Sequence, residues 1–195
     1  MSYTHFSDKE LIERYQEGCV ACFEVLLERY KSKVYSYIMM LAKDKQLAED
    51  LFQDTFVKII RTIKADLYHD EGKFIQFAMR IAHNLIIDHF RRAKKLPIVD
   101  SVSEDYNVID NLRISDPSKE QQMIREQVYA DLRKMIDYLP SEQREVLFLR
   151  MYQDMSFKDI AEVTNVSINT ALGRMRYALI NMRKMMKEND LTVMV

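Results

Sequence analysis

A long apolar stripe between residues 73 and 95 places the strongest constraint on how this chain can fold. Its members recur at helical spacing, and they are Phe74, Phe77, Ala78, Ile81, Ala82, Leu85 and Ile86. The other side of the helix carries polar residues, namely Arg80, His83, Asn84, Asp88 and Arg91. The spacing therefore predicts an amphipathic helix that lies on a core and leaves a polar face outward. Pro97 stops this helix after a basic cluster, which could also be a solvated last turn favoured by the helix dipole.

A shortage of turn residues extends the helical prediction to the whole chain. The 195 residues include only three glycines and three prolines, whereas strands and hairpins usually need more of both. We therefore predict an all-α protein of one domain or two small ones. The net charge of −1 does not suggest a nucleic-acid partner, but acids and bases are segregated along the chain.

Four predicted helices make up an N-terminal bundle over residues 7–95. Their expected ranges are 7–18, 20–42, 47–65 and 73–95. Ser7 opens the first helix in a capping box, and Asp44 is placed to cap the third. The third helix carries a polar stripe, which comprises Glu49, Asp50, Gln53, Asp54 and Lys58. From the pattern alone, this stripe is most simply a solvated surface.

Residues 96–118 interrupt the helical pattern and are predicted to form an extended, flexible acidic linker. Pro97 and Pro117 bracket the segment, and residues 100–116 contain five acids against a single base, Arg113. From composition alone, the segment is a tether between two helical domains.

Residues 119–187 are predicted to form a second helical domain that ends in a helix-turn-helix. Its later helices are expected at 142–152, 156–163 and 168–187. Asn165 suits a left-handed turn between the last two, and Ser167 caps the final helix. The side of that helix predicted to be buried comprises Ala171, Met175, Ala178 and Met182. From Ser167 to Lys187 there are five basic residues and no acid, which is typical of a major-groove helix, although a basic helix that only balances acids elsewhere would look the same.

Cys19 and Cys22 form the only C-x-x-C pair. We interpret them as ordinary thiols, because neither a βαβ context for redox chemistry nor a second pair for zinc is present; a reducing cytoplasm is the matching compartment. No segment resembles a signal peptide or approaches the ~20 apolar residues of a membrane span, so we expect no membrane insertion. We also expect no catalytic residues, metal or cofactor, because no nucleophile-base pair, metal-ligand spacing or phosphate-binding glycine loop occurs.

Three motifs in this order resemble the sigma factors of bacterial RNA polymerase. They lie at 48–56 (AEDLFQDTF), at 74–92, and at 139–146 (LPSEQREV) followed by 156–161 and 170–174. The compact two-domain form is similar to the extracytoplasmic-function (ECF) group, and the resemblance covers about residues 7–187. It implies a sigma region-two domain at 7–95, the acidic linker at 96–118 and a sigma region-four domain at 119–187.

The resemblance also implies partners and contact residues. The helix at 48–63 would dock on the β′ clamp helices of core RNA polymerase through Asp50, Gln53, Asp54 and Phe56. The loop at 67–73 and the next helix would recognise and melt the minus-ten promoter element through Tyr68, His69, Lys73, Arg80, Asn84, Arg91 and Arg92, because opening DNA needs a pocket for an unstacked base and cations for the strand. The second domain would touch the β flap and read the minus-thirty-five element through Ser167, Asn169, Thr170, Gly173, Arg174, Arg176 and Tyr177. The acidic linker would occupy the cationic RNA channel, and an anti-sigma factor is a further partner that the sequence does not localise.

Some positions depart from the pattern of the family. Phe77 stands where many relatives carry tryptophan, and His83 stands where arginine is common. The pair Leu172-Gly173 replaces a basic residue followed by serine. Either the backbone at Gly173 approaches DNA closely, or base reading shifts to Asn169, Arg176 and Tyr177. Two other functions fit the patterns: a free-standing helix-turn-helix regulator with an N-terminal sensing bundle, and a helical interaction module with an incidental basic tail.

Overall fold

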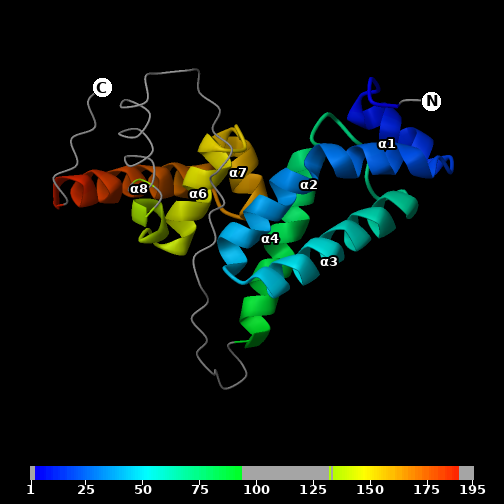
Figure 1. The fold of residues 1–195 in the computed structure, drawn as a ribbon. Coiled ribbons are helices and arrows are strands. Elements are labelled where there is room, and N and C mark those ends of the chain that lie inside the picture. Colours follow the sequence, from blue (N-terminus) through cyan, green and yellow to red (C-terminus); the bar gives the residue numbers. More distant parts are fainter. Residues whose placement is uncertain (1–2, 94–131, 133, 189–195) are drawn as a thin grey trace, which may run out of the picture. The chain divides into compact units, whose positions relative to one another are not determined.

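The computed structural model describes residues 3–93, 132 and 134–188, and every regular element in these residues is an α-helix (Figure 1). The all-α prediction is therefore confirmed. The chain forms two compact units, which we describe separately. The predicted acidic linker, the first part of the predicted second domain and the predicted helix end at Lys95 lie outside the described residues.

The N-terminal unit contains four helices, α1 (Asp8–Gln16), α2 (Val20–Ala42), α3 (Lys45–Lys64) and α4 (Phe74–Ala93). The long helix α2 packs against α1, α3 and α4, and α3 also packs along α4. The largest side chains that this packing buries completely are Leu11, Leu26, Tyr37, Ile38, Ile59, Ile63, Phe74, Met79 and Ile86. A four-helix arrangement around one core is thus confirmed for this unit.

Capping residues set the helix starts in the N-terminal unit. The Ser7 backbone N–H donates to the Glu10 carboxylate at 2.8 Å, and the Glu10 N–H donates back to Ser7 Oγ at 3.3 Å. Gly18 follows α1 with a φ of +106°, which stops the helix. Asp44 Oδ1 accepts from the Leu47 N–H at 2.7 Å, so α3 begins directly after its cap, two residues before the predicted start.

The C-terminal unit contains α6 (Ser141–Met151), α7 (Phe157–Val163) and α8 (Ile168–Glu188). Helix α6 packs against α8, and Asn181 Nδ2 on α8 donates to Gln143 Oε1 on α6 at 2.8 Å. A small core between them consists of Leu139, Leu147 and Ala178, flanked by Ile136, Met175, Met182 and Met185. Asn165 adopts a φ of +53° in the turn that precedes α8, so the predicted helix-turn-helix is confirmed.

Two further observations concern the described part of the chain as a whole. No helix there is both long enough and apolar enough to cross a lipid bilayer. Within the same residues, no group of three or more histidine, cysteine, aspartate or glutamate side chains is placed to hold a metal ion.

Candidate polymerase and nucleic-acid interfaces

One buried carboxylate organises the loop between α3 and α4. Asp70 is only 7% exposed, and its side chain accepts hydrogen bonds from three donors. These donors are the Tyr68 hydroxyl at 2.5 Å, the Gly72 backbone N–H at 3.1 Å and the Lys73 backbone N–H at 3.2 Å. Gly72 has a φ of +79°, a left-handed conformation that glycine adopts without strain. The charged acceptor therefore fixes both the backbone of the loop and one aromatic side chain.

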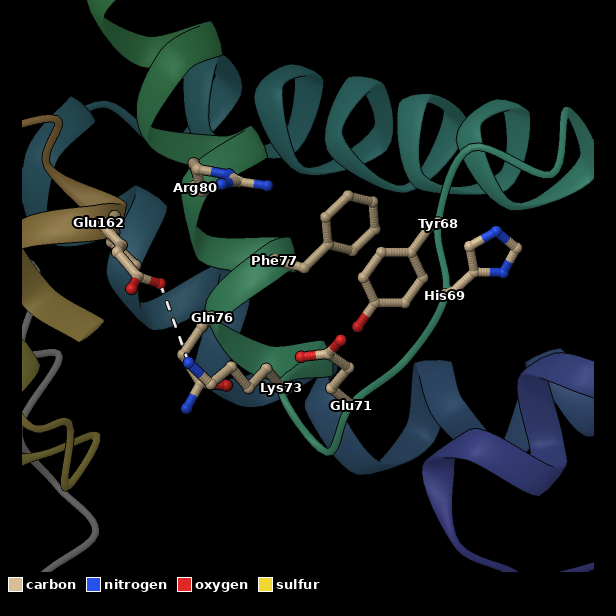
Figure 2. A pocket seen from close by; sticks show the side chains of 9 residues that line it. Tyr68, His69, Glu71, Lys73, Gln76, Phe77, Arg80 and Glu162 are labelled. Atoms are coloured by element: carbon tan, nitrogen blue, oxygen red, sulfur yellow. Dashed lines mark ion pairs between the residues drawn. The ribbon is translucent and has the colours of Figure 1, made fainter. Parts of the chain in front are cut away.

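Tyr68 packs inward from this loop onto α4 (Figure 2). Its ring stacks on Phe77, with centroids 3.9 Å apart and planes 13° apart, and it meets Phe74 edge-on at 6.3 Å. Burial raises the pKa of Tyr68 above its ordinary value, and the hydrogen bond to Asp70 acts in the same direction. The hydroxyl thus stays protonated and remains a donor at neutral pH. Tyr68 supports the loop from inside, a role that the sequence analysis did not predict.

Polar side chains flank the stacked pair of Tyr68 and Phe77. Figure 2 shows Arg80 on the side of Phe77 and His69 on the side of Tyr68. Arg80 and His69 are exposed, and Lys73 at the start of α4 is half-buried. A ring that offers an edge or face beside exposed polar and cationic groups can hold an unstacked base. The structure therefore brings together four of the residues expected at the minus-ten site, but whether they contact DNA stays a prediction.

The outer face of α4 continues this polar surface. Arg80, Asn84, Asp88 and Arg91 are four, four and three residues apart, so they lie along one side of the helix. Arg80, Arg91 and Arg92 are exposed, whereas Asn84 is half-buried. Arg91 Nη2 lies 3.0 Å from Asp88 Oδ1, and an exposed pair of this kind is weak enough to be exchanged for another anion. A line of exposed guanidinium groups suits a phosphate backbone.

His83 does not lie on this outer face, which corrects the sequence interpretation. It is 7% exposed, and its Nδ1 lies 3.2 Å from the hydroxyl of Tyr37 on α2. The buried face of α4 is wider than the predicted stripe, because α2 and α3 both pack against it. Met79 and His83 form the additional ridge, next to Ile86 of the predicted stripe, and Met79 is fully buried. A residue at this position therefore contributes to packing and not to a cationic surface.

The polar stripe of α3 is exposed where the sequence analysis expects polymerase contacts. Asp50, Gln53 and Asp54 are all exposed. Val57 lies on the same face, seven residues after Asp50 and three after Asp54, and it is 43% exposed. The sequence analysis missed Val57, although an apolar residue at this spacing within a polar stripe is itself a signal. This face of α3 therefore combines one exposed apolar side chain with two exposed acids.

Phe56 differs from its expected role as a polymerase contact. It is 6% exposed, and its ring centroid lies 4.9 Å from that of Phe52 and 6.4 Å from that of Phe23. The core-facing residues of α3 are Ala48, Leu51, Thr55, Phe56, Ile59 and Ile63. Phe56 therefore belongs to the face that holds α3 on the bundle. It supports the stripe by holding α3 on the bundle, and only a small part of its side chain is exposed for contact with a partner.

The start of α8 combines a helix cap with exposed polar residues. Ser167 Oγ accepts from the Thr170 N–H at 3.1 Å and lies 2.9 Å from Thr170 Oγ1. Asn169 and Thr170 are exposed on the first turn. Further along, Arg176 is exposed and Tyr177 is 61% exposed. Ser167 is thus engaged in capping, while the other four side chains are exposed to solvent.

Gly173 lies within α8 and has room for a side chain. Apart from its chain neighbours and the nearby backbone of the same helix, no heavy atom lies within 4 Å of the position that a Cβ would take. A glycine inside a helix costs roughly 1 kcal/mol relative to alanine, so internal packing gives no reason for it. Leu172 before it is 44% exposed, and Arg174 after it is half-buried. Close approach of an external backbone or base remains the prediction that accounts for the glycine.

Two family models match the chain in the order of its two units. Sigma-70 region 2 matches residues 26–96, and Sigma-70 region 4 matches residues 129–176. The first range covers most of α2, all of α3 and the loop and helix around Asp70. The second range covers α6, α7 and the first half of α8.

Named relatives agree with these matches. The chain is 29% identical over 174 residues to the RNA polymerase sigma-H factor of Pseudomonas aeruginosa. The aligned region covers 88% of this chain and 89% of that protein. It is 27% identical over 172 residues to the ECF RNA polymerase sigma-E factor of Haemophilus influenzae, covering 86% and 89% of the two chains. The fold resembles that of the sigma factor RpoE from Bartonella quintana, whose structure was solved in complex with the anti-sigma factor NepR. The TM-score is 0.64 at 20% sequence identity, and the match covers 86% of this chain and 98% of that one.

Proposed function

Because this chain belongs to the ECF sigma factors of bacterial RNA polymerase, we propose that it binds core RNA polymerase, directs it to specific promoters and promotes opening of the DNA strands. The observation that carries the proposal is the order of the two matched regions. Region 2 coincides with a bundle whose outer faces are acidic on α3 and basic on α4. Region 4 coincides with a helix-turn-helix whose last helix is basic and exposed.

We assign each exposed surface to one partner of transcription initiation. The α3 stripe, Asp50, Gln53, Asp54 and Val57, binds the β′ clamp helices. The Asp70 loop and the outer face of α4 bind the minus-ten element. His69, Lys73 and Arg80 contact an unstacked nucleotide base, and Arg91 and Arg92 contact the phosphates of the DNA strand. The exposed side of α8 reads the minus-thirty-five element through Asn169, Thr170, Arg176 and Tyr177, and the same domain contacts the β flap. The α3 assignment is supported by the exposure of its residues, and the two DNA assignments are supported by exposed cationic side chains, which complement the phosphate backbone.

Three statements about context complete the proposal. The protein has no catalytic step of its own, because its family acts by placing and opening DNA for another enzyme. It acts in the cytoplasm, where bacterial polymerase meets the chromosome. An anti-sigma factor is a further partner, and the solved complex of a protein with the same fold is the observation that favours it.

Reconstituted transcription tests the function directly. Purified protein added to bacterial core polymerase over a library of random promoters should yield transcripts that share two sequence elements at a fixed spacing. Core polymerase alone should yield none of them. A free-standing helix-turn-helix regulator would instead footprint its operator without polymerase and would leave the transcripts unchanged. A helical interaction module would show no salt-dependent binding to DNA at all.

Arg176→Ala should reduce discrimination at the minus-thirty-five element. Arg176 is exposed on the outer side of α8, and one bidentate contact from a guanidinium to guanine is worth about 1 to 3 kcal/mol of discrimination. Competition binding of the holoenzyme to single-base variants of a promoter measures the loss. The effect should be concentrated at one or two base pairs. An equal loss on every sequence would assign Arg176 to a phosphate.

A further inference from the structure

The two cysteines meet at the beginning of α2. Cys19 is the N-cap residue of this helix, and Cys22 lies in its first turn. The Cys22 thiol donates to Cys19 Sγ, with the two sulfur atoms 2.8 Å apart. Cys19 is partly exposed, whereas Cys22 is completely buried. One sulfur is therefore accessible to solvent and the other lies directly behind it.

The surroundings of Cys19 favour its thiolate. The hydrogen bond from the Cys22 thiol lowers the pKa of Cys19, Tyr3 and Arg14 act in the same direction, and partial burial of Cys19 opposes them without reversing the direction. Burial raises the pKa of Cys22 to about 11, and its hydrogen bond to Cys19 adds to this. The positive end of a 23-residue helix also stabilises an anion at its N-cap. Tyr3, Arg14 and Cys22 are thus the titratable or charged groups that face Cys19, and they place the nucleophile and the proton on different sulfurs.

We propose that Cys19 and Cys22 are a redox-active dithiol that a small disulfide, such as oxidised glutathione, converts to an intramolecular disulfide. The Cys19 thiolate attacks one sulfur of the small disulfide, its S–S bond breaks, and one thiolate leaves. Cys22 then loses its proton to the departed thiolate and attacks Cys19 in the mixed disulfide, which releases the second small thiol. The protein is oxidised by two electrons, and the small disulfide is reduced to two thiols.

Because both cysteines lie at the start of one helix, formation of the disulfide needs only a small change of structure around them. The two residues are three apart at a helix start, and their sulfur atoms are already in contact, so the bridge closes without unfolding the bundle. The sequence analysis interpreted these cysteines as ordinary thiols because no βαβ motif was present. A helix N-terminus that supplies the same electrostatic stabilisation replaces that motif.

The test uses the full-length protein with oxidised glutathione and does not involve polymerase, so its failure is separate from failure of the proposed function. Mass spectrometry should show the loss of two hydrogens without glutathione attached, and a dithiol should reverse it. Cys22→Ser should stop at a glutathione adduct on Cys19. Cys19→Ser should react at least about tenfold more slowly, because the buried thiol is protonated. The chain has only two cysteines, so both readouts are unambiguous.

A measurement on the unaltered protein removes any dependence on how the variants fold. Iodoacetamide alkylation followed by peptide mapping should modify Cys19 before Cys22, and the Cys19 rate should persist to lower pH than for an ordinary thiol, because the thiolate is the reacting species. Equal alkylation rates at the two cysteines would overturn the proposal. So would wild-type protein that accumulates the glutathione adduct or intermolecular dimers instead of the internal disulfide.

Discussion

Asp70→Ala should reduce formation of the open promoter complex by about 100-fold while polymerase binding is retained. The substitution removes the acceptor for the Tyr68 hydroxyl and for two backbone N–H groups. Hydrogen bonds to a charged group contribute about 1.5 to 3 kcal/mol each, and a loss of about 3 kcal/mol in the ordered loop corresponds to that factor. The loop would then sample many shapes, and only a small fraction would place His69 and Lys73 correctly.

Permanganate footprinting of the minus-ten region measures strand opening, and fluorescence anisotropy measures polymerase affinity. Glu71→Ala is the matched control, because Glu71 neighbours Asp70 in the same loop but is exposed. Tyr68→Phe is a milder test that keeps the ring stack and removes only the hydroxyl donor. It should lower opening by less than Asp70→Ala does. Normal opening by the Asp70→Ala protein would show that the loop does not need this carboxylate.

Reversing two charges on α3, Asp50→Lys together with Asp54→Lys, should weaken core polymerase binding by about 100-fold at low salt. Close charge pairs across an interface contribute about 1.5 to 7 kcal/mol, and reversal replaces attraction by repulsion. The difference should shrink as salt rises, because exposed charges more than about 10 Å apart are screened at 0.1 M ionic strength. Both residues are exposed, so the helix content in circular dichroism should not change.

Glu24→Lys with Glu28→Lys is the matched control for this experiment. Glu24 and Glu28 have the same spacing as Asp50 and Asp54, and they are exposed on α2. The control changes the net charge of the protein by the same amount at a different surface. If the two double variants lose polymerase affinity equally, the effect comes from overall charge and the assignment of the α3 stripe is wrong.

The helices and their starts could be predicted because local chemistry determines them. The capping box at Ser7, the Asp44 cap and the left-handed Asn165 are each visible within a few residues of sequence, and the structure has all three. The range of α2 is also as predicted, because a long apolar periodicity with a glycine before it leaves little choice. Local signals of this kind do not depend on which other helix packs nearby.

The roles of individual side chains were less predictable, because they depend on tertiary packing. His83 lies on the polar side of a helical wheel, but α2 packs over it and Tyr37 provides a hydrogen-bond partner. Asp70 is one of several acids in its loop, and nothing in its neighbours indicates that it is the buried one. Phe56 matches the motif of the family and yet faces the core. The position of a residue in a family motif indicates that the residue is important. Whether it contacts a partner or packs inside the core depends on the tertiary fold.

Gly173 has a consequence for how this protein could change over time. Alanine at that position would fit the available space and strengthen the helix by roughly 1 kcal/mol, so thermal selection favours the substitution. Promoter recognition would select against alanine at this position if its methyl group prevented close approach of the DNA. We therefore predict that Gly173 trades roughly 1 kcal/mol of helix stability for close approach to DNA, and that relatives which read other promoters can carry alanine there.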